Sequence, residues 1–423
     1  MNERGSPLTA GQWWAISLCA LAAFFDGYDA QMLAMAIPLM ADAFHAQPTA
    51  FAAAASGSLA GMALGAMLLS PLADRFGRRP MLVASLFILG VATLAATGST
   101  QPAQVAAWRT LAGCGLGAVV PITIAIVADI APAARRVTIV TLMASGFTIG
   151  AASSGLIAPW LTQRWGWQGL FAYGGFMPLV IGALCWRGIP DSREPAGSAR
   201  DARSAANAQG VAQPGALQRV AALFAPQYRW RTLFMWMLTA LNLFANYGLF
   251  SWLPTLLVQN GWTLAAASRV TSFLAIGGLT GCYVVSTLAD RGRTVIALIG
   301  VYVTGATALA LCATNPGSAW AWAVLIVLIG FGGIGASLTL APLASTYYPP
   351  HLRSTGVGWA NGIGRAGSFF GPLALAWLMQ KNLPPAMVLG ALMVPMALCA
   401  VFVTLLPLAL RAGGVSPDQE RRR

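Results

Sequence analysis

Long apolar stretches follow one another along the whole chain, and they constrain its fold more than any other feature. Crossing the hydrocarbon core of a bilayer as a helix takes about 20 mainly apolar residues, and each stretch is long enough to do so. Only 9% of the residues are charged, whereas a soluble domain carries about 25%. Backbone polar groups inside a bilayer must be satisfied within the protein, so each stretch should be helical. We expect an all-α integral membrane protein with twelve transmembrane helices, over approximately 13–40, 51–73, 80–98, 103–130, 137–160, 168–188, 231–258, 265–289, 294–313, 318–347, 354–380 and 384–411.

A polar stretch between the sixth and seventh of these segments divides the chain into two halves. It covers about 190–229, is rich in Ala, Arg, Ser, Gln and Gly, and has no clear apolar period. Such a composition is typical of a flexible linker. We therefore predict a six-helix bundle over 1–189, a linker over 190–229, and a second six-helix bundle with a short tail over 230–423.

The two halves repeat one another. The sequence Ser-Pro-Leu-Ala-Asp-Arg-Phe-Gly-Arg-Arg begins at Ser70, and a similar sequence, Ser-Thr-Leu-Ala-Asp-Arg-Gly-Arg, begins at Ser286, 216 positions later. The same offset relates Gly146 to Gly362. A shared offset over several helices indicates an internal duplication. Two parallel six-helix repeats with a site at the membrane midplane are the plan of transporters in which one half rocks against the other.

The basic residues set the expected topology. Arg109 and Arg365 fall inside apolar segments, and Arg164, Arg269 and Lys381 fall on one side of the membrane. All the others of the 25 basic residues fall on the opposite side, which the positive-inside rule makes cytoplasmic, together with both termini. The formal charge of +13 is thus a topology signal, and we expect no nucleic-acid partner.

Four ionisable residues lie deep in the predicted spans. Asp26 and Asp29, three positions apart, share one face of the first helix. A charge at this depth costs about 2.5–3.5 kcal/mol, so it persists where it pairs, faces water or carries protons. The opposite directions of helices one and four place Arg109 near the depth of Asp29, so we expect these two side chains to approach each other. We expect Arg365, in the eleventh helix, to face Asp26 across a cavity. A purely structural ion pair remains an alternative.

These groups suit a carrier that binds an anion and a proton together. The Arg365 guanidinium can hold a carboxylate through two parallel hydrogen bonds. Asp26 and Asp29 can take up a proton when the cavity changes access, with Arg109 as a movable counter-ion. The offset of 216 places Asn242, which cannot titrate, where the first half has Asp26. Flat apolar walls with few polar groups suit an aromatic ring, and the candidates for contact with it are Tyr28, Asn242, Asn246, Trp252, Trp359 and Asn361.

The repeated cytoplasmic loop predicts a gate. Gly77 permits a tight turn, and acidic side chains there can hold basic side chains or helix N-termini across the cytoplasmic face. Such a latch would close the inner entrance in one state and release it in the other. The residues predicted to form it are Asp74, Arg75, Gly77, Arg78, Asp290, Arg291 and Arg353.

Several motifs together resemble the major facilitator superfamily, and among its members the aromatic acid:proton symporters. The cytoplasmic loop, the run Arg-Thr-Leu-Ala-Gly-Cys-Gly-Leu-Gly from Arg109, the sequence Asp-Gly-Tyr-Asp from Asp26, and Ser-Trp-Leu-Pro-Thr-Leu-Leu from Ser251 carry the resemblance. Asp129 stands where the family commonly has Glu, and the resemblance places it with the proton-coupling residues. The resemblance implies a protein of two pseudo-symmetric bundles in a bacterial inner membrane. It also implies that this protein imports a benzoate or hydroxybenzoate together with protons.

Other functions remain open from the sequence alone. The same fold could import another organic acid or expel a compound by proton antiport. An enzyme could use Asp26 and Asp29 as a catalytic pair, but the sequence contains no nucleophile–base or metal-ligand cluster beside them, and the duplication would be unexplained. A sensor would need an output domain, for which the linker is too short and irregular. We therefore expect a monomeric carrier, not an enzyme, with no cofactor and no metal.

Overall fold

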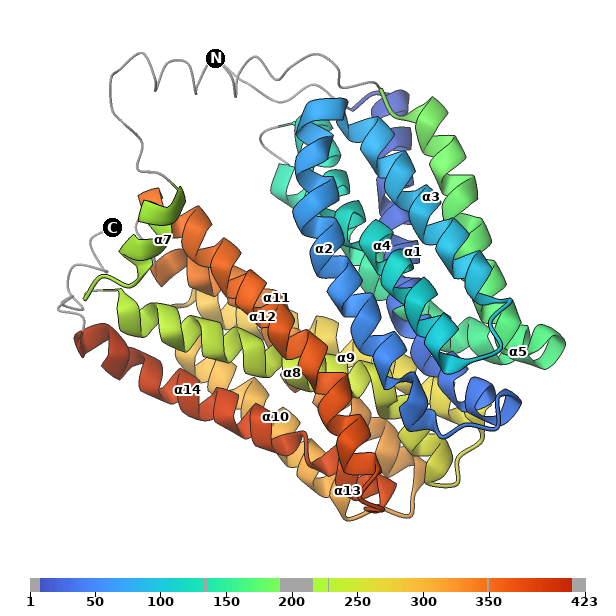
Figure 1. Cartoon of the computed structure of the whole chain (residues 1–423). Coiled ribbons are helices and arrows are strands. Elements are labelled where there is room, and N and C mark those ends of the chain that lie inside the picture. The colour runs from blue at the N-terminus through green and yellow to red at the C-terminus, as the bar shows by residue number, and fades with distance from the viewer. Residues whose placement is uncertain (1–7, 133–135, 191–215, 227, 348–349, 413–423) are drawn as a thin grey trace. The chain divides into compact units, whose positions relative to one another are not determined.

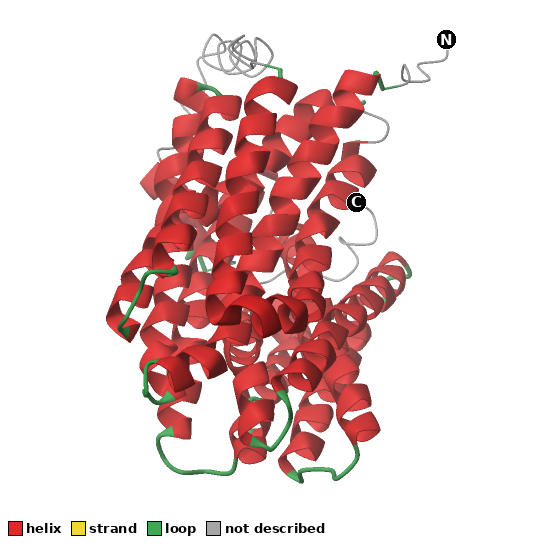
Figure 2. Cartoon of the chain, turned by 90° about the vertical axis from the view of Figure 1, so that its right-hand side faces the viewer, coloured by secondary structure: helices red, strands yellow, loops and turns green. Residues whose placement is uncertain are grey.

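The computed structural model describes residues 8–132, 136–190, 216–226, 228–347 and 350–412. Every regular element in these ranges is a helix, and they contain no strand (Figure 2). Among the described residues, nine helices are long and apolar enough to cross a membrane. One of the nine, at Leu142–Gly188, is long enough to contain two of the predicted spans. The all-α expectation is confirmed.

The helices follow the predicted spans to within a few residues at most ends. They are α1 Ala10–Ala43, α2 Ala52–Phe76, α3 Arg78–Ala96, α4 Pro102–Ile130, α5 Arg136–Gly188, α7 Ala216–Leu223, α8 Arg229–Gln259, α9 Leu264–Asp290, α10 Thr294–Ala313, α11 Ala319–Tyr347, α12 Pro350–Met379, α13 Pro385–Gly390 and α14 Met393–Ala412. A 3₁₀ turn, η1, covers Pro48–Phe51 before α2.

Two predicted spans merge and one divides. The fifth and sixth spans form the single element α5, which bends at Gly166, where φ is 61° and ψ is −156°. That backbone region favours glycine, which has no Cβ to clash there. The last predicted span is broken into α13 and α14 between Gly390 and Met393.

The end of the predicted linker is helical. The helix α7 lies inside the range expected to be irregular, and Leu223 at its end is fully buried against Leu352 of α12. The next residue, Phe224, meets the ring of Trp236 edge to face at 5.4 Å. The burial of Leu223 and the ring contact of Phe224, which is itself largely exposed, therefore anchor this part of the linker, which the sequence interpretation missed. Residues 191–215 lie outside the described residues.

The chain forms two compact units. One contains Met1–Pro195 and Phe250–Ser272, and the other contains Ala196–Leu249 and Phe273–Arg423. The first unit thus includes the end of α8 and the start of α9. There Gln31 of α1 donates to the carbonyl oxygen of Phe250 at 3.3 Å, and Ser272 donates to that of Ala152 at 2.8 Å. The predicted domain division at the linker stays a prediction.

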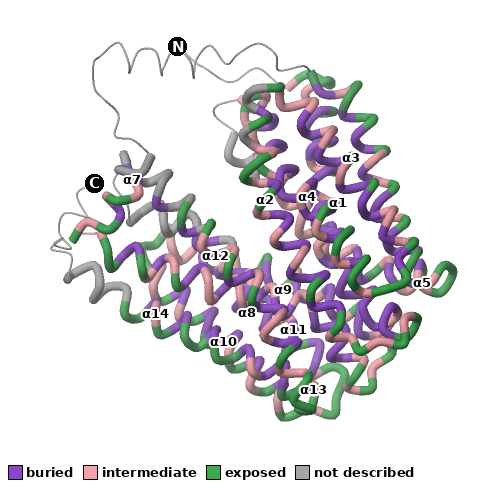
Figure 3. The backbone as a smooth tube through the Cα atoms, viewed as in Figure 1, coloured by how far each residue is buried: buried purple, intermediate pink, exposed green. Residues whose placement is uncertain are grey.

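Small residues let the helices of the first unit approach closely, as in other membrane proteins. α1 packs along α5 and α2 along α4 (Figure 1). A Cβ added to Gly150 would overlap the carbonyl group of Phe24, and one added to Gly117 would overlap that of Met62. α1 is buried along most of its length, as the purple segments in Figure 3 show, and this burial encloses two of its acidic residues, Asp26 and Asp29.

We predict that Gly150→Ala lowers the stability of the protein. The new methyl group would force α1 and α5 apart, and overpacking of this kind costs about 1–3 kcal/mol. The measurement is the melting temperature in detergent. Gly300→Ala is the matched control, because a Cβ at Gly300 of α10 has no neighbour within 4 Å. Equal melting temperatures for the two variants would contradict the close packing of α1 on α5.

Candidate functional site

A buried ion pair joins α1 to α4 in the first unit. Nη1 of Arg109 donates to Oδ1 of Asp29 at 2.7 Å, and Nη2 donates to Oδ2 at 2.6 Å. Both side chains are almost completely buried, with 1% and 0% exposed. Two parallel charge-assisted hydrogen bonds make this the strongest class of side-chain pair. The predicted approach of these two residues is confirmed.

Two further helices contribute hydroxyl groups to the pair. Ser58 of α2 accepts a hydrogen bond from Nη2 of Arg109 at 3.1 Å, and Thr93 of α3 donates to Oδ1 of Asp29 at 3.4 Å. The pair therefore joins α1, α2, α3 and α4. Sequence analysis did not identify Ser58 and Thr93; the signal that could have found them is a hydroxyl residue in each span that packs beside the acid or the arginine.

Asp26 lies one helical turn before Asp29 and is also buried, with 1% exposed. A helix rises about 1.5 Å per residue, so the backbone positions of Asp26 and Asp29 are about 4.5 Å apart along the α1 axis. A second carboxyl group therefore lies close to the first. Asp26 belongs to the first unit and Arg365 to the second. The expectation that these two face each other across a cavity therefore stays a prediction.

Arg365 of α12 differs from Arg109 in its surroundings. Its side chain is partly exposed, and among the residues whose side chains the structure describes it has no hydrogen-bond or ion-pair partner. A guanidinium in a membrane span is costly unless it meets an anion, backbone oxygens or water. Arg365 thus has its five donors available for a ligand.

The second unit contains a neutral amide cluster around Asn242 and Asn246. Both amide nitrogens donate to the carbonyl oxygen of Gly333, at 3.2 and 3.1 Å. Asn242 also donates to the Tyr302 hydroxyl at 3.1 Å, and its oxygen accepts from Asn246 at 3.0 Å and from Ser337 at 2.7 Å. Most of these polar atoms are satisfied inside the protein, so the cluster joins α8, α10 and α11. Sequence analysis missed Tyr302 and Ser337.

The predicted aromatic contacts do not form one described cluster. Tyr28 is fully buried, donates to the carbonyl oxygen of Leu170 at 3.2 Å, and meets the ring of Tyr173 at 5.2 Å. Trp252 is fully buried within the first unit. Trp359 of the second unit is 43% exposed and stacks on Trp236 at 5.8 Å. Their contact with a substrate stays a prediction, and the side chain of Asn361 lies outside the described residues.

Asp129 pairs with the predicted gate and not with the buried acids. Its carboxylate forms an ion pair with Arg78, which also donates to the carbonyl oxygen of Ala125 at 2.8 Å. The Asp129 side chain is 55% exposed. It follows Arg109 by 20 residues on α4, which is about 30 Å along a helix. The structure therefore pairs Asp129 with Arg78, a residue of the predicted gate, and the proton-coupling role of Asp129 stays a prediction.

The loop itself turns where the sequence predicted. Gly77, between α2 and α3, has φ 97°, and Gly292, between α9 and α10, has φ 71°. Arg291 in the second loop is exposed. The side chains of four other predicted gate residues lie outside the described residues: Asp74, Arg75, Asp290 and Arg353.

Comparison with known proteins identifies the family. The Major Facilitator Superfamily model matches residues 19–372. The chain is 31% identical to a gallate transporter of Pseudomonas putida, over 87% of this chain and 85% of the relative. It is 31% identical to the 4-hydroxybenzoate transporter PcaK of Pseudomonas aeruginosa, over 94% and 93%, and 29% identical to a benzoate transport protein of Acinetobacter baylyi, over 95% and 91%.

Solved structures agree on the fold. The chain matches a D-xylose–proton symporter with a TM-score of 0.72 at 16% identity, over 92% of this chain and 97% of that one. It matches a bacterial homologue of the lysosomal transporter Spinster with a TM-score of 0.70 at 15% identity, over 98% and 100%. The chain therefore belongs to the Major Facilitator Superfamily and, within it, to the group of aromatic acid transporters.

Proposed function

We propose that the protein is a proton-coupled symporter that imports an aromatic carboxylate, such as a benzoate or hydroxybenzoate, by alternating access. The contrast between its two intramembrane arginines carries this proposal. Arg109 is buried and neutralised by Asp29, whereas Arg365 is partly exposed with no anionic partner among the described side chains. One arginine thus belongs to an acid that can bind a proton, and the other is available to an anion.

Arg365 is proposed to hold the substrate carboxylate. A guanidinium remains charged at all physiological pH values and presents parallel donors that match a carboxylate. The relatives that transport gallate, 4-hydroxybenzoate and benzoate all carry a compound with this group on an aromatic ring. The ring itself would lie against aromatic side chains, of which Trp359 is exposed enough to make contact.

The Asp29–Arg109 pair is proposed to couple proton binding to the change in access. When Asp29 takes up a proton it no longer neutralises Arg109, and the guanidinium needs another anion. Asp26, one turn away on the same helix, is the nearest carboxyl group along α1. Movement of Arg109 between these acids would change how α1 packs on α4. It would also alter the packing of α2 and α3, because Ser58 of α2 bonds to Arg109 and Thr93 of α3 bonds to Asp29.

The protein is proposed to act as a monomer in the cytoplasmic membrane of a bacterium, with both termini inside. The distribution of basic residues supports this orientation. In it, the Arg78–Asp129 pair lies at the cytoplasmic end of α3 and α4. Since the pair joins the start of α3, directly after the Gly77 turn, to α4, it is suited to hold the inner entrance closed in one state.

We expect proteoliposomes with the wild-type protein to accumulate labelled benzoate or 4-hydroxybenzoate when the outside is acidic. A protonophore should abolish accumulation, and Asp26→Asn should abolish it while leaving exchange of labelled for unlabelled substrate. The variant removes the anion that Arg109 needs when Asp29 is protonated, but it keeps the shape of the Asp26 side chain. Absence of aromatic acid uptake by the wild type would favour another organic acid or efflux. Coupled uptake by Asp26→Asn at the wild-type rate would remove this residue from the proton path.

We predict that Arg365→Ala weakens substrate binding about tenfold or more, because a charged hydrogen bond contributes about 1.5–3 kcal/mol. Arg365→Lys should recover part of the loss, since it restores the charge without the parallel donors. Isothermal titration of benzoate and 4-hydroxybenzoate into detergent-solubilised protein measures the dissociation constants. Arg269→Ala, at an exposed position at the start of α9, is the control. Equal affinities for Arg365→Ala and this control would rule out Arg365 as the carboxylate anchor.

We predict that Asp29→Asn lowers both stability and coupled uptake, because it leaves Arg109 buried without its counter-charge. Breaking one partner of a buried pair costs about 3–5 kcal/mol. The double variant Asp29→Asn with Arg109→Gln should regain much of the melting temperature but not the coupled uptake. If the double variant also transported like the wild type, the pair would serve packing alone.

A further inference from the structure

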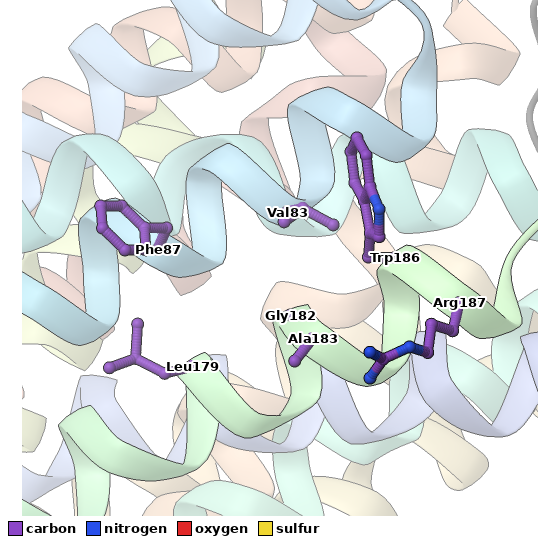
Figure 4. Close-up of a pocket in the computed structure, with 7 residues that line it drawn as sticks. All are labelled: Val83, Phe87, Leu179, Gly182, Ala183, Trp186 and Arg187. Carbon is purple, nitrogen blue, oxygen red and sulfur yellow. The ribbon is translucent and has the colours of Figure 1, made fainter.

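A groove lies between α3 and the second half of α5, on a part of the first unit that the proposed transport site does not use. Its volume is about 420 Å³, within the range of ligand sites. Figure 4 shows Val83 and Phe87 on one ribbon and the other residues on the ribbon opposite. The full lining is Val83, Phe87, Leu179, Gly182, Ala183, Trp186 and Arg187.

The groove is apolar along its length and basic at one end. Five of its seven lining residues, from Val83 to Ala183, have apolar or no side chains, and Trp186 and Arg187 follow near the end of α5. Leu179 and Arg187 are eight residues apart, or about 12 Å along a helix. Half of a hydrocarbon core is about 15 Å thick. The groove therefore has the length of one leaflet, with its tryptophan and arginine at the depth of the headgroups, where such residues are enriched.

A second arginine strengthens the positive end. The guanidinium carbon of Arg79, in the first turn of α3, lies 4.9 Å from the centre of the Trp186 ring. Arg79 also donates to the carbonyl oxygen of Ile189 at 3.4 Å, just after α5. Arg79 over the Trp186 ring and Arg187 in the lining thus bring two arginines to this end of the groove, and none of the residues that line it is acidic.

We infer that this groove binds one anionic phospholipid of the leaflet on the side of the Arg78–Asp129 pair. An acyl chain would lie along Leu179, Ala183 and Val83, and the phosphate would meet Arg187 beside Trp186. Basic pockets between membrane helices bind acidic headgroups for the same electrostatic reason. The apolar length excludes a free phosphate as the natural ligand, because a small ion would leave most of the groove unused.

Native mass spectrometry of the full-length protein tests this inference. The protein is released from nanodiscs that contain equal amounts of phosphatidylglycerol and phosphatidylcholine, and the retained lipids are counted. We expect the wild type to retain one phosphatidylglycerol in preference to phosphatidylcholine. Arg187→Gln should reduce that preference about fivefold, the order expected for one basic residue near an anionic headgroup. Arg187→Lys should restore it.

A variant that fills the groove distinguishes the contribution of the groove's shape to lipid binding from that of its positive charge. Gly182→Leu should reduce retention of both lipids, since a Cβ at this position meets its neighbours at ordinary distances of 3.6 Å or more and the longer side chain would occupy the groove. Arg229→Gln is the control, because Arg229 lies beside Trp230 at the start of α8 and does not line the groove. Equal phosphatidylglycerol retention by the wild type, Arg187→Gln and Gly182→Leu would overturn the inference. The assay needs no transport, so its outcome is independent of the proposed symport.

Discussion

The buried ion pair between Asp29 and Arg109 is the interaction on which the first unit depends. Two charges taken out of water are stable together but costly apart, and each also meets a hydroxyl, from Ser58 or Thr93. Four helices must therefore keep their relative positions for the pair to remain intact. The close approach of α1 to α5 at Gly150 encloses α1 from the other side, so the pair cannot be relieved by exposing α1 to water.

The second unit joins its helices through neutral amide groups, where the first unit uses an ion pair. The offset of 216 relates Asp26 to Asn242 and Gly117 to Gly333. In both units the first helix of the repeat is hydrogen-bonded to the fourth. In the first unit Arg109 of α4 donates to Asp29 of α1, and in the second Asn242 of α8 donates to the carbonyl oxygen of Gly333 in α11. The amide cluster joins the helices but cannot take up a proton. The two units thus join the same pair of helices, one through an ion pair and the other through neutral amides.

The sequence predicts the spans well because apolar length is a strong signal, and it predicts the Asp29–Arg109 contact because charges in a bilayer need partners. The turn at Gly77 was equally predictable from its residue type. The aromatic contacts were not. Lipid-facing and buried faces of a membrane helix are both apolar, so Tyr28 and Trp359 look alike in sequence although one is fully buried and the other 43% exposed.

Asp129 and α7 show two further features that the sequence alone could not predict. The family resemblance places Asp129 with the proton-coupling residues, but it does not indicate the ion-pair partner, Arg78 at the start of α3, because only the fold brings α3 and α4 together at that point. The helix α7 is short, and its stability depends on burial of Leu223 against Leu352, far away in sequence. In both cases the deciding contact is tertiary, and no local pattern encodes it.

The energy of the ion pair is of the size that alternating access requires. Shifting a two-state equilibrium from 1:99 to 99:1 takes about 5.5 kcal/mol, and loss of one partner of a buried pair costs about 3–5 kcal/mol. A proton on Asp29 would remove most of the electrostatic part of that stabilisation from the arrangement in which α1 and α4 are joined. A carboxylate that binds at Arg365 could supply the remainder through charged hydrogen bonds of about 1.5–3 kcal/mol. Under the proposed mechanism neither ligand alone reaches the required energy, so the change of access is favoured only when proton and carboxylate are both bound.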